Sequence, residues 1–269
     1  MSKIVALLAM LVVPRPEGPV ALDPVGSWIA DYADAQCFLS RDFGTEKNRI
    51  TLGFGLLPGA ESDEIYLLEP ERDSPQLHRS EVEVDFGSGS RPIKEAGIIT
   101  RNSTGGRITR ITSKAVQVAA FRTATTIDIT SDGKRYRLNL SAMKAAFAAS
   151  DACEQDLVRK WGLDPALLTD AATPATPVPG SEAWITFDDY PPEAIRAGKG
   201  GLTVFRLDVD AKGAVGGCTI VASSGFEALD QQTCLVMRKR ARFNPARRTD
   251  GTAVPTIWLN RVRWAVSRG

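Results

Sequence analysis

The last third of the chain carries the pattern that most constrains its fold. Apolar and polar residues alternate from Thr203 to Val209, and the alternation returns from Val254 to Val266. A period of two gives a strand one buried and one wetter face. Between these runs lie a second strand-like segment, Val215–Ala222, and a segment from Glu227 with apolar residues at helical spacing. The order predicts two strands, a helix and a final strand.

Turn and helix signals fix the limits of these elements. Tyr190-Pro191-Pro192 opens a short helix, because proline at the first helical positions needs no amide donor. Gly200-Gly201 ends that helix, Asp210–Gly213 turns the chain between the first two strands, and Pro245 ends the second helix. Leu229, Thr233, Val236 and Met237 share one helix face, and Trp258, Val262 and Trp264 share one face of the final strand.

An earlier region, Trp28–Gly162, is rich in short strand-like segments separated by turn formers such as Asp132-Gly133. The predicted strands are Ile50–Leu57, Ile65–Leu68, Val82–Phe86, Ile98–Thr100, Ile108–Ile111, Val116–Phe121, Thr125–Thr130 and Tyr136–Leu140. Many short strands with frequent turns indicate an antiparallel sandwich or an open barrel. A helix capped by Ser141 and a second helix from Asp151 to Trp161, ended by Gly162, are expected to close this domain.

The chain is therefore expected to be an α+β protein with two domains. Residues 25–163 form a β-rich antiparallel domain ending in helices, and residues 184–269 form the C-terminal unit. The intervening residues 164–183 include DAATPATPVPGS, which is rich in Pro, Ala and Thr. This composition predicts an extended, semi-rigid linker.

Residues 1–24 resemble an export signal or a short anchor. Lys3 precedes the apolar run Ile4–Val13. As a helix this run would be about 15 Å long, half of a bilayer's hydrocarbon core. A cleaved signal peptide is the favoured interpretation, with a retained N-terminus as the alternative because no clear cleavage site follows. The expected location is the periplasm, and membrane contact is expected only through an uncleaved N-terminus.

Four cysteines, Cys37, Cys153, Cys218 and Cys234, fit an oxidising compartment. Of the three possible connectivities, Cys37–Cys153 with Cys218–Cys234 keeps each bridge within one domain; free buried thiols are the alternative. The chain has a single histidine, His78, and no C-x-x-C pair. We therefore expect no metal and no cofactor.

Charge and motifs argue against two further classes of protein. The region from Trp184 onward has 13 basic and 8 acidic residues, but aromatic residues are not interleaved with the charges, so we do not expect nucleic-acid binding. No nucleophile elbow, P-loop or dinucleotide fingerprint lies in a suitable context. We expect no enzymatic activity.

The C-terminal unit resembles the C-terminal domain of the TonB family. The resemblance covers about 80 residues and rests on Tyr190-Pro191, Leu207-Asp208-Val209, Gly213-Ala214-Val215, Ser223-Ser224-Gly225 with Leu229-Asp230, Arg242-Phe243 and Pro245-Ala246. It implies helices packed on one face of a three-stranded antiparallel sheet. It also implies binding of an extended peptide from an outer-membrane transporter by addition to a sheet edge, in energy-dependent transport across the outer membrane.

From this resemblance we expect the partner to contact the final strand and the Tyr-Pro segment. The candidate partner-binding residues are Tyr190, Pro191, Trp258, Asn260, Arg261, Val262 and Arg263. Arg261 and Arg263 are expected to face outward, either discouraging unwanted strand pairing or simply solvated. Cys218 and Cys234, on a strand and a helix that face each other, are expected to form a disulfide.

The sequence also departs from a full transducer. We expect neither a spanning helix nor a long Pro-rich spacer, and Phe187-Asp188-Asp189 precedes Tyr190 where the family often has a Gln-Pro-Gln run. Asp188 and Asp189 are expected to cap the following helix. The alternative function is a periplasmic envelope scaffold or interaction protein whose β-rich domain does the binding. A domain-swapped homodimer is conceivable for either function.

Overall fold

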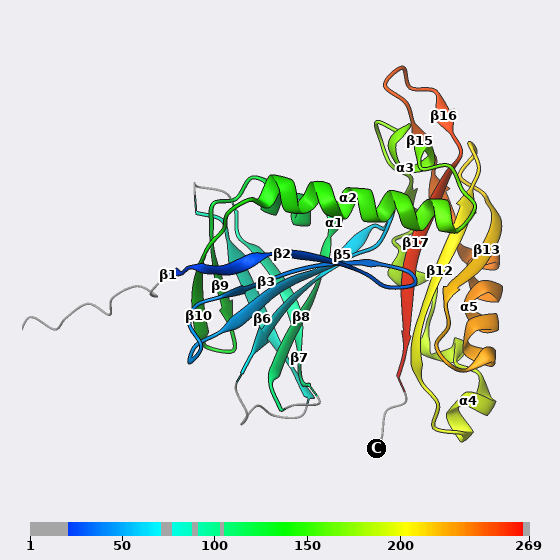
Figure 1. The fold of residues 1–269 in the computed structure, drawn as a ribbon. Coiled ribbons are helices and arrows are strands. Elements are labelled where there is room, and N and C mark those ends of the chain that lie inside the picture. The colour runs from blue at the N-terminus through cyan, green and yellow to red at the C-terminus, as the bar shows by residue number, and fades with distance from the viewer. Residues whose placement is uncertain (1–20, 71–76, 88–90, 103–104, 266–269) are drawn as a thin grey trace, which may run out of the picture.

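The computed structural model describes residues 21–70, 77–87, 91–102 and 105–265, which form two packed domains (Figure 1). The predicted signal or anchor, apart from its last residues, lies outside the described residues. The first domain begins at Ala21 rather than at residue 25, because Ala21–Leu22 already pairs within the sheet. Within the described residues, no helix is long and apolar enough to cross a membrane.

A ten-stranded sheet makes up most of the first domain, in the order β1-β10-β9-β6-β7-β8-β5-β4-β3-β2. Its strands are β1 (Ala21–Leu22), β2 (Pro24–Tyr32), β3 (Cys37–Phe43), β4 (Ile50–Leu56), β5 (Ser62–Glu69), β6 (Leu77–Asp85), β7 (Ile93–Arg101), β8 (Arg107–Lys114), β9 (Thr126–Ser131) and β10 (Lys134–Asn139). Only Asp23 separates β1 from β2, although these strands pair at opposite ends of the sheet. The sheet therefore closes on itself as a barrel.

The barrel interior is filled with side chains. Its core contains Leu52, Phe54 and Ile65 from the strands, together with Phe121 and Phe147 from the helices. The hairpin between β9 and β10 turns at Asp132-Gly133, as predicted, with positive φ at both residues. Every described strand pair except β1–β10 is antiparallel.

Three predictions for this domain were wrong. The segment Val116–Phe121 is not a strand but belongs to α1 (Ala115–Val118) and the 3-10 helix η1 (Ala119–Arg122). The two closing helices are one, α2 (Met143–Lys160). Ser141 does not cap α2, because the N-cap position is Ala142 and the Ser141 hydroxyl accepts a hydrogen bond from Arg41. Gly162 does follow the helix in the left-handed region, with φ of 74°.

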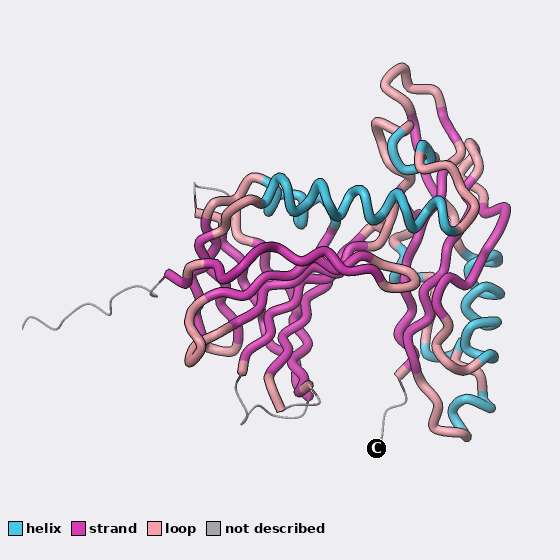
Figure 2. The backbone as a smooth tube through the Cα atoms, viewed as in Figure 1, coloured by secondary structure: helices cyan, strands magenta, loops and turns pink. Residues whose placement is uncertain are grey.

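The C-terminal domain contains a three-stranded antiparallel sheet in the order β13-β12-β17. Its main elements are α4 (Pro192–Arg196), β12 (Gly201–Val209), β13 (Val215–Ala222), α5 (Glu227–Arg240) and β17 (Thr256–Trp264). Smaller elements are η3 (Phe187–Asp189), β14 (Phe243–Asn244), β15 (Ala246–Arg247) and β16 (Ala253–Val254). The helices lie on the sheet face that points away from the first domain (Figure 2). The predicted helix face, Leu229 to Met237, is buried as expected. The predicted α+β fold is confirmed.

Residues 164–183, which we interpreted as a linker, are extended but attached to the C-terminal domain. They include α3 (Ala166–Thr169), β11 (Thr176–Pro177) and η2 (Ser181–Ala183). Strand β11 pairs with β14, and Thr173 bridges to Arg247. Ala175 is buried in the C-terminal core. Several backbone hydrogen bonds, including those of Thr173 and Val178, therefore attach this segment to the C-terminal domain.

Both predicted disulfides are present. Cys37–Cys153 joins the start of β3 to α2, and Cys218–Cys234 joins β13 to α5. Each bridge stays within one domain and secures a helix to its sheet.

Candidate functional site: the outer edge of the C-terminal sheet

Strand β17 forms one edge of the C-terminal sheet. It pairs with β12 from Thr256 to Trp264, and no strand within the described residues pairs with its other side. The amide N–H of Arg261 donates to the side-chain oxygen of Asn260 at 2.8 Å, so it points away from β12. Because bonded and non-bonded residues alternate in an antiparallel pair, the backbone groups of Leu259 and Arg263 also face this outer edge.

The two faces of β17 are occupied by different parts of the protein. Trp258 and Trp264 pack toward the helices, Trp258 against Phe243 and Trp264 against Tyr190. Ile257 and Leu259 pack on the opposite face in an apolar cluster shared with the first domain and α3. A partner approaching β17 therefore finds both faces covered and only the backbone edge free.

A groove with a volume of about 330 Å³ follows this edge. One wall is the segment from Ser181 to Ile185, and the other is β17 itself from Trp258 to Arg263. Ser62, at the start of β5, brings the first domain to the groove. The groove thus combines an edge strand with the segment that precedes η3 and with a residue of the first domain.

Trp184 fixes the groove wall formed by Ser181–Ile185 to the core of the C-terminal domain. Its side chain is 1% exposed, and its ring lies 5.5 Å from that of Trp258 and 5.2 Å from that of Phe243. Arg240 donates to the Trp184 carbonyl oxygen at 2.7 Å. These contacts hold the wall beside β17 without pairing backbone to backbone.

We expected Arg261 to face outward, but in the structure its side chain is largely buried. Its guanidinium lies 2.6 Å from the Glu64 carboxylate of β5, and both side chains are largely buried. Arg261 also donates to the Ser62 carbonyl oxygen at 3.3 Å. This residue therefore joins β17 to the first domain, because a buried guanidinium requires a carboxylate and carbonyl acceptors.

The Glu64 carboxylate interacts with several side chains. Besides Arg261 it lies 3.7 Å from Arg110 on β8 and accepts a hydrogen bond from the Tyr66 hydroxyl. Burial raises the pKa of Tyr66, and the negative Glu64 beside it raises that pKa further. The Tyr66 hydroxyl therefore keeps its proton and acts as a donor to Glu64.

Arg263 lies at the same end of β17, and its side chain reaches solvent. Partial burial lowers the pKa of its guanidinium, and the nearby cation of Arg110 lowers it further. An arginine remains charged even so. Arg263 is thus a cation held close to other cations.

The other predicted binding residues are divided between core and groove. Tyr190 is 6% exposed, and its hydroxyl donates to the Lys199 carbonyl oxygen at 2.6 Å. Pro191 is buried beside it. Trp258, Asn260 and Val262 line the groove, although the Trp258 ring belongs to the core. Tyr190 and Pro191 are therefore largely buried within the domain, and their part in partner binding stays a prediction.

The prediction that Asp188 and Asp189 cap the following helix was wrong, because the N-cap of α4 is Pro191; Asp189 instead closes a capping box with Thr186 at η3. Its carboxylate accepts from the Thr186 amide at 2.8 Å and lies 2.6 Å from Arg240. Although burial of the carboxyl opposes ionisation, its hydrogen bonds from Arg240 and Thr186 hold the pKa of Asp189 below the ordinary value. Asp188 is exposed.

Sequence reasoning missed the residues that the first domain contributes, namely Ser62, Glu64, Tyr66 and Arg110, and the wall residue Trp184. The one available signal was a pair of acidic residues, Asp63-Glu64, inside an otherwise apolar strand. Within the described residues, no group of His, Cys, Asp and Glu side chains is arranged to hold a metal ion.

The comparisons with known proteins agree with the C-terminal geometry. Residues 188–266 match the family model described as Gram-negative bacterial TonB protein C-terminal. This confirms the resemblance drawn from the sequence, for the C-terminal domain. No match was found among curated proteins or among solved structures.

Proposed function

We propose that the C-terminal domain binds an extended segment of an envelope protein by strand addition at the outer edge of β17. The proposed partner is an outer-membrane transporter, and the proposed role is in energy-dependent transport across the outer membrane. The protein acts by binding and carries out no catalysis. The free backbone edge of β17, in a domain that matches the TonB C-terminal family, is the observation that supports this function most strongly.

Strand addition suits this site because main-chain groups supply affinity and flanking pockets supply selectivity. The outward amide of Arg261 is bonded only to the neighbouring Asn260 side chain, which a guest carbonyl can replace at little cost. The groove beside the strand accommodates every second guest side chain.

A periplasmic location is part of the proposal. The two disulfides are stable in an oxidising compartment and uncommon in a reducing one. Each joins a helix to its sheet, so reduction would loosen both domains.

Alternately N-methylated peptides test the binding mode. A short transporter-derived peptide that binds the full chain is made in two versions, methylated on odd or on even backbone nitrogens. In strand addition only one set of amides faces β17, so one version should lose binding at least tenfold while the other keeps it. Co-purification with an outer-membrane transporter should be blocked by the unmethylated peptide. Equal effects of both methylation patterns, or no transporter captured, would contradict the proposal.

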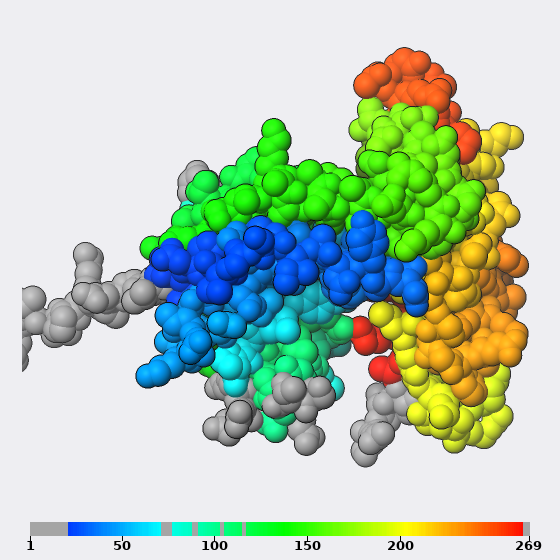
Figure 3. Space-filling view, in the orientation of Figure 1, coloured from blue at the N-terminus to red at the C-terminus, as the bar shows by residue number. Residues whose placement is uncertain are grey.

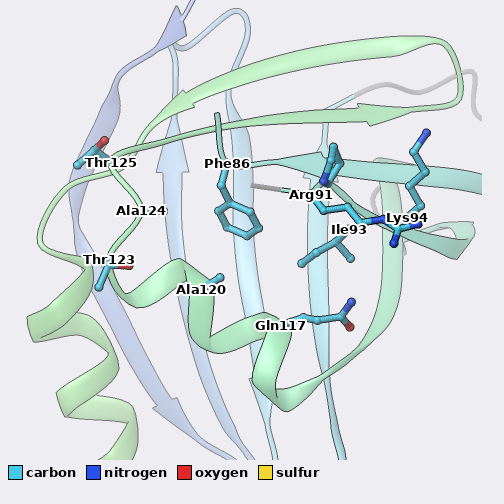
Figure 4. Close-up of a pocket in the computed structure, with 10 residues that line it drawn as sticks. Phe86, Arg91, Ile93, Lys94, Gln117, Ala120, Thr123, Ala124 and Thr125 are labelled. Atoms are coloured by element: carbon cyan, nitrogen blue, oxygen red, sulfur yellow. The ribbon is translucent and has the colours of Figure 1, made fainter. Parts of the chain in front are cut away.

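A cavity in the first domain supports a second candidate function, in which that domain binds the partner as an envelope scaffold. The cavity has a volume of about 830 Å³, within the range of ligand pockets. Figure 4 shows Arg91, Lys94 and Gln117 near one another on one side, with Phe86 and Ile93 beside them. Lys94 is already paired with Glu83 at 2.8 Å, which reduces the free charge of the site.

Filling the cavity separates the two functions. Ala120 lines the cavity and is exposed, so Ala120→Trp should occupy it without disturbing the core. If the Ala120→Trp variant still co-purifies with the transporter, and the peptide that binds β17 blocks this co-purification, the C-terminal edge is the binding site. The reverse result would assign binding to the first domain.

A further inference from the structure

The first domain places its own charged residues beside the free edge of β17. The odd-numbered side chains of β17 point toward that domain, where Arg261 meets Glu64 of β5. Figure 3 shows a hollow between the two domains in which the end of β17, drawn in red, is visible. A guest strand on β17 would therefore lie next to the barrel wall as well as next to the C-terminal sheet.

Charge in this region is unbalanced. Glu64 is shared by Arg261 at 2.6 Å and Arg110 at 3.7 Å. Arg263 adds a third guanidinium two residues further along β17, on the same face as Arg261, and the cation of Arg110 disfavours its charge; within the described residues no salt bridge includes Arg263. Glu182 is the acidic residue among those that line the groove, and it is exposed on the opposite wall. Glu64 thus pairs with two guanidinium groups, the buried carboxyl of Asp63 also interacts with Arg261, and Arg263 has neither carboxylate as an ion-pair partner.

Strand geometry decides which guest side chains would reach these cations. Residues directly opposite each other on paired strands have Cβ atoms about 5 Å apart and point to the same face. A guest residue opposite Arg263 would therefore send its side chain toward the first domain, near Arg263 and Arg110. Its neighbours along the guest strand would point to the other face, toward Val262, Ile185 and Trp184.

We propose that the guest segment alternates apolar with acidic residues, and that an acidic side chain binds between Arg263 of the C-terminal domain and Arg110 of the first domain. This inference rests on strand addition at β17. It gives the first domain a part in selecting the partner, because Arg110 and the carboxylate that holds Arg261 both come from the barrel. The partner is thus an extended peptide with negative charge on one face only.

Two matched peptides test this proposal on the full chain. Both alternate valine with a second residue, which is glutamate in one and glutamine in the other, and binding is measured by fluorescence anisotropy. In 20 mM salt the glutamate peptide should bind about tenfold more tightly. The difference should shrink severalfold in 300 mM salt, because charges that reach solvent are screened.

Substitutions then assign the effect to residues. Arg263→Gln and Arg110→Gln should each remove most of the preference for glutamate while leaving binding of the glutamine peptide within twofold. Arg196→Gln is the matched control, because Arg196 is exposed on α4, away from the groove. It should leave both affinities unchanged.

Equal binding of the two peptides, or a preference that survives Arg263→Gln, would overturn the inference and leave strand addition intact. Binding of neither peptide, together with failure of the transporter-derived peptide to bind, would instead overturn strand addition itself. An equal loss for both peptides in Arg263→Gln would also overturn the inference, because it would mean that Arg263 supports the strand rather than selects charge.

Discussion

Two carboxyl groups in the first domain sit where burial opposes their charge. Burial is the main cause that raises the pKa of Asp63 on β5 to about 6 and that of Glu154 on α2 to about 8. Arg122 lowers both pKa values, whereas Asp63 and Asp151 raise that of Glu154. They line a small cavity of about 220 Å³ together with Arg122. Because their charge is opposed by burial, both groups make the stability of the protein depend on pH.

Replacing Glu154 should make stability less dependent on pH. A carboxyl whose pKa is raised in the folded state stabilises fully below its unfolded pKa, 4.5 for Glu154, and this stabilisation is lost as pH rises through about 8. Glu154→Gln should therefore match the wild type at pH 4, below the unfolded pKa. At pH 8.5 it should be more stable by about 1–2 kcal/mol, a discounted value because the side chain is partly exposed.

Urea unfolding at both pH values measures this difference. Glu193→Gln, at an exposed position on α4, serves as the control and should change stability equally at both pH values. A variant that is less stable than the wild type at pH 8.5 would show that Glu154 is held ionised by Arg122 instead.

The ion pair between Arg261 and Glu64 should contribute more than an exposed pair. Arg261→Met would leave Glu64 buried with only Arg110 and Tyr66, at a cost of about 2–3 kcal/mol. Arg248→Met removes an exposed pair with Asp170 and should cost less than about 1 kcal/mol. Urea unfolding compares the two variants, and equal costs would mean that the interdomain pair is screened by water.

At the scale of elements, each domain depends on covalent attachment of a helix to its sheet. Cys234 lies on α5 and Cys218 on β13, next to the core that includes Trp258. The strand that offers the free edge is therefore supported indirectly by this disulfide. Segment 170–184 packs on the same core, through the pairing of β11 with β14 and through Trp184.

Removing the C-terminal disulfide should destabilise the protein by about 3 kcal/mol, the value for a loop of this size. Cys218→Ser/Cys234→Ser is compared with Cys37→Ser/Cys153→Ser, which opens a loop with a sequence separation of 116 and should cost more, about 4–5 kcal/mol. Urea unfolding at neutral pH, with intact mass to verify the remaining bridge, measures both. A larger loss for the short loop would show that native strain or residual structure outweighs loop entropy.

Some elements could not be assigned from the sequence for a physical reason. Val116–Phe121 is short and apolar, and such runs do not distinguish strand from helix by period. Tertiary packing decides the outcome, because Val118 and Phe121 lie three apart and both enter the barrel core. Serine is a common helix N-cap residue. In this structure, however, the Ser141 hydroxyl accepts a hydrogen bond from Arg41, and the Ser141 carbonyl oxygen accepts one from Trp28.

At the scale of the whole molecule, the two domains share a core. The cluster between them contains Ala35 and Leu57 of the first domain, Val158 of α2, and Val204 and Leu259 of the C-terminal sheet. Thr256 also donates to the Leu167 carbonyl oxygen at 2.9 Å. Burial of apolar surface on this scale favours one cooperative unit over two independent domains.

The intact protein should therefore unfold in a single calorimetric transition. Leu259→Asp places a carboxylate in the shared cluster, where the wild-type side chain is 0% exposed, and should separate the transition into two or lower its midpoint by at least 10 °C. Leu235→Asp, at an exposed position of α5, is the control and should change the midpoint by less than about 2 °C. Two transitions in the wild type would show that the domains unfold independently.

The sequence by itself determined the local order of the C-terminal domain and one hairpin of the first domain. Alternation defined β12 and β17, helical spacing defined the buried face of α5, and Asp132-Gly133 defined a hairpin, because each depends on neighbouring residues. The cysteine pairing also followed once the domains were separated.

Only the tertiary structure decided how the edge of β17 is presented. Closure of the barrel through Asp23, the attachment of residues 170–183 and the pairing of Arg261 with Glu64 all join residues far apart in sequence. Their positions depend on which surfaces the two domains bury against each other. The periodicity of a short segment cannot predict these contacts. The same strand pattern occurs whether the outer face of the strand contacts water or another domain.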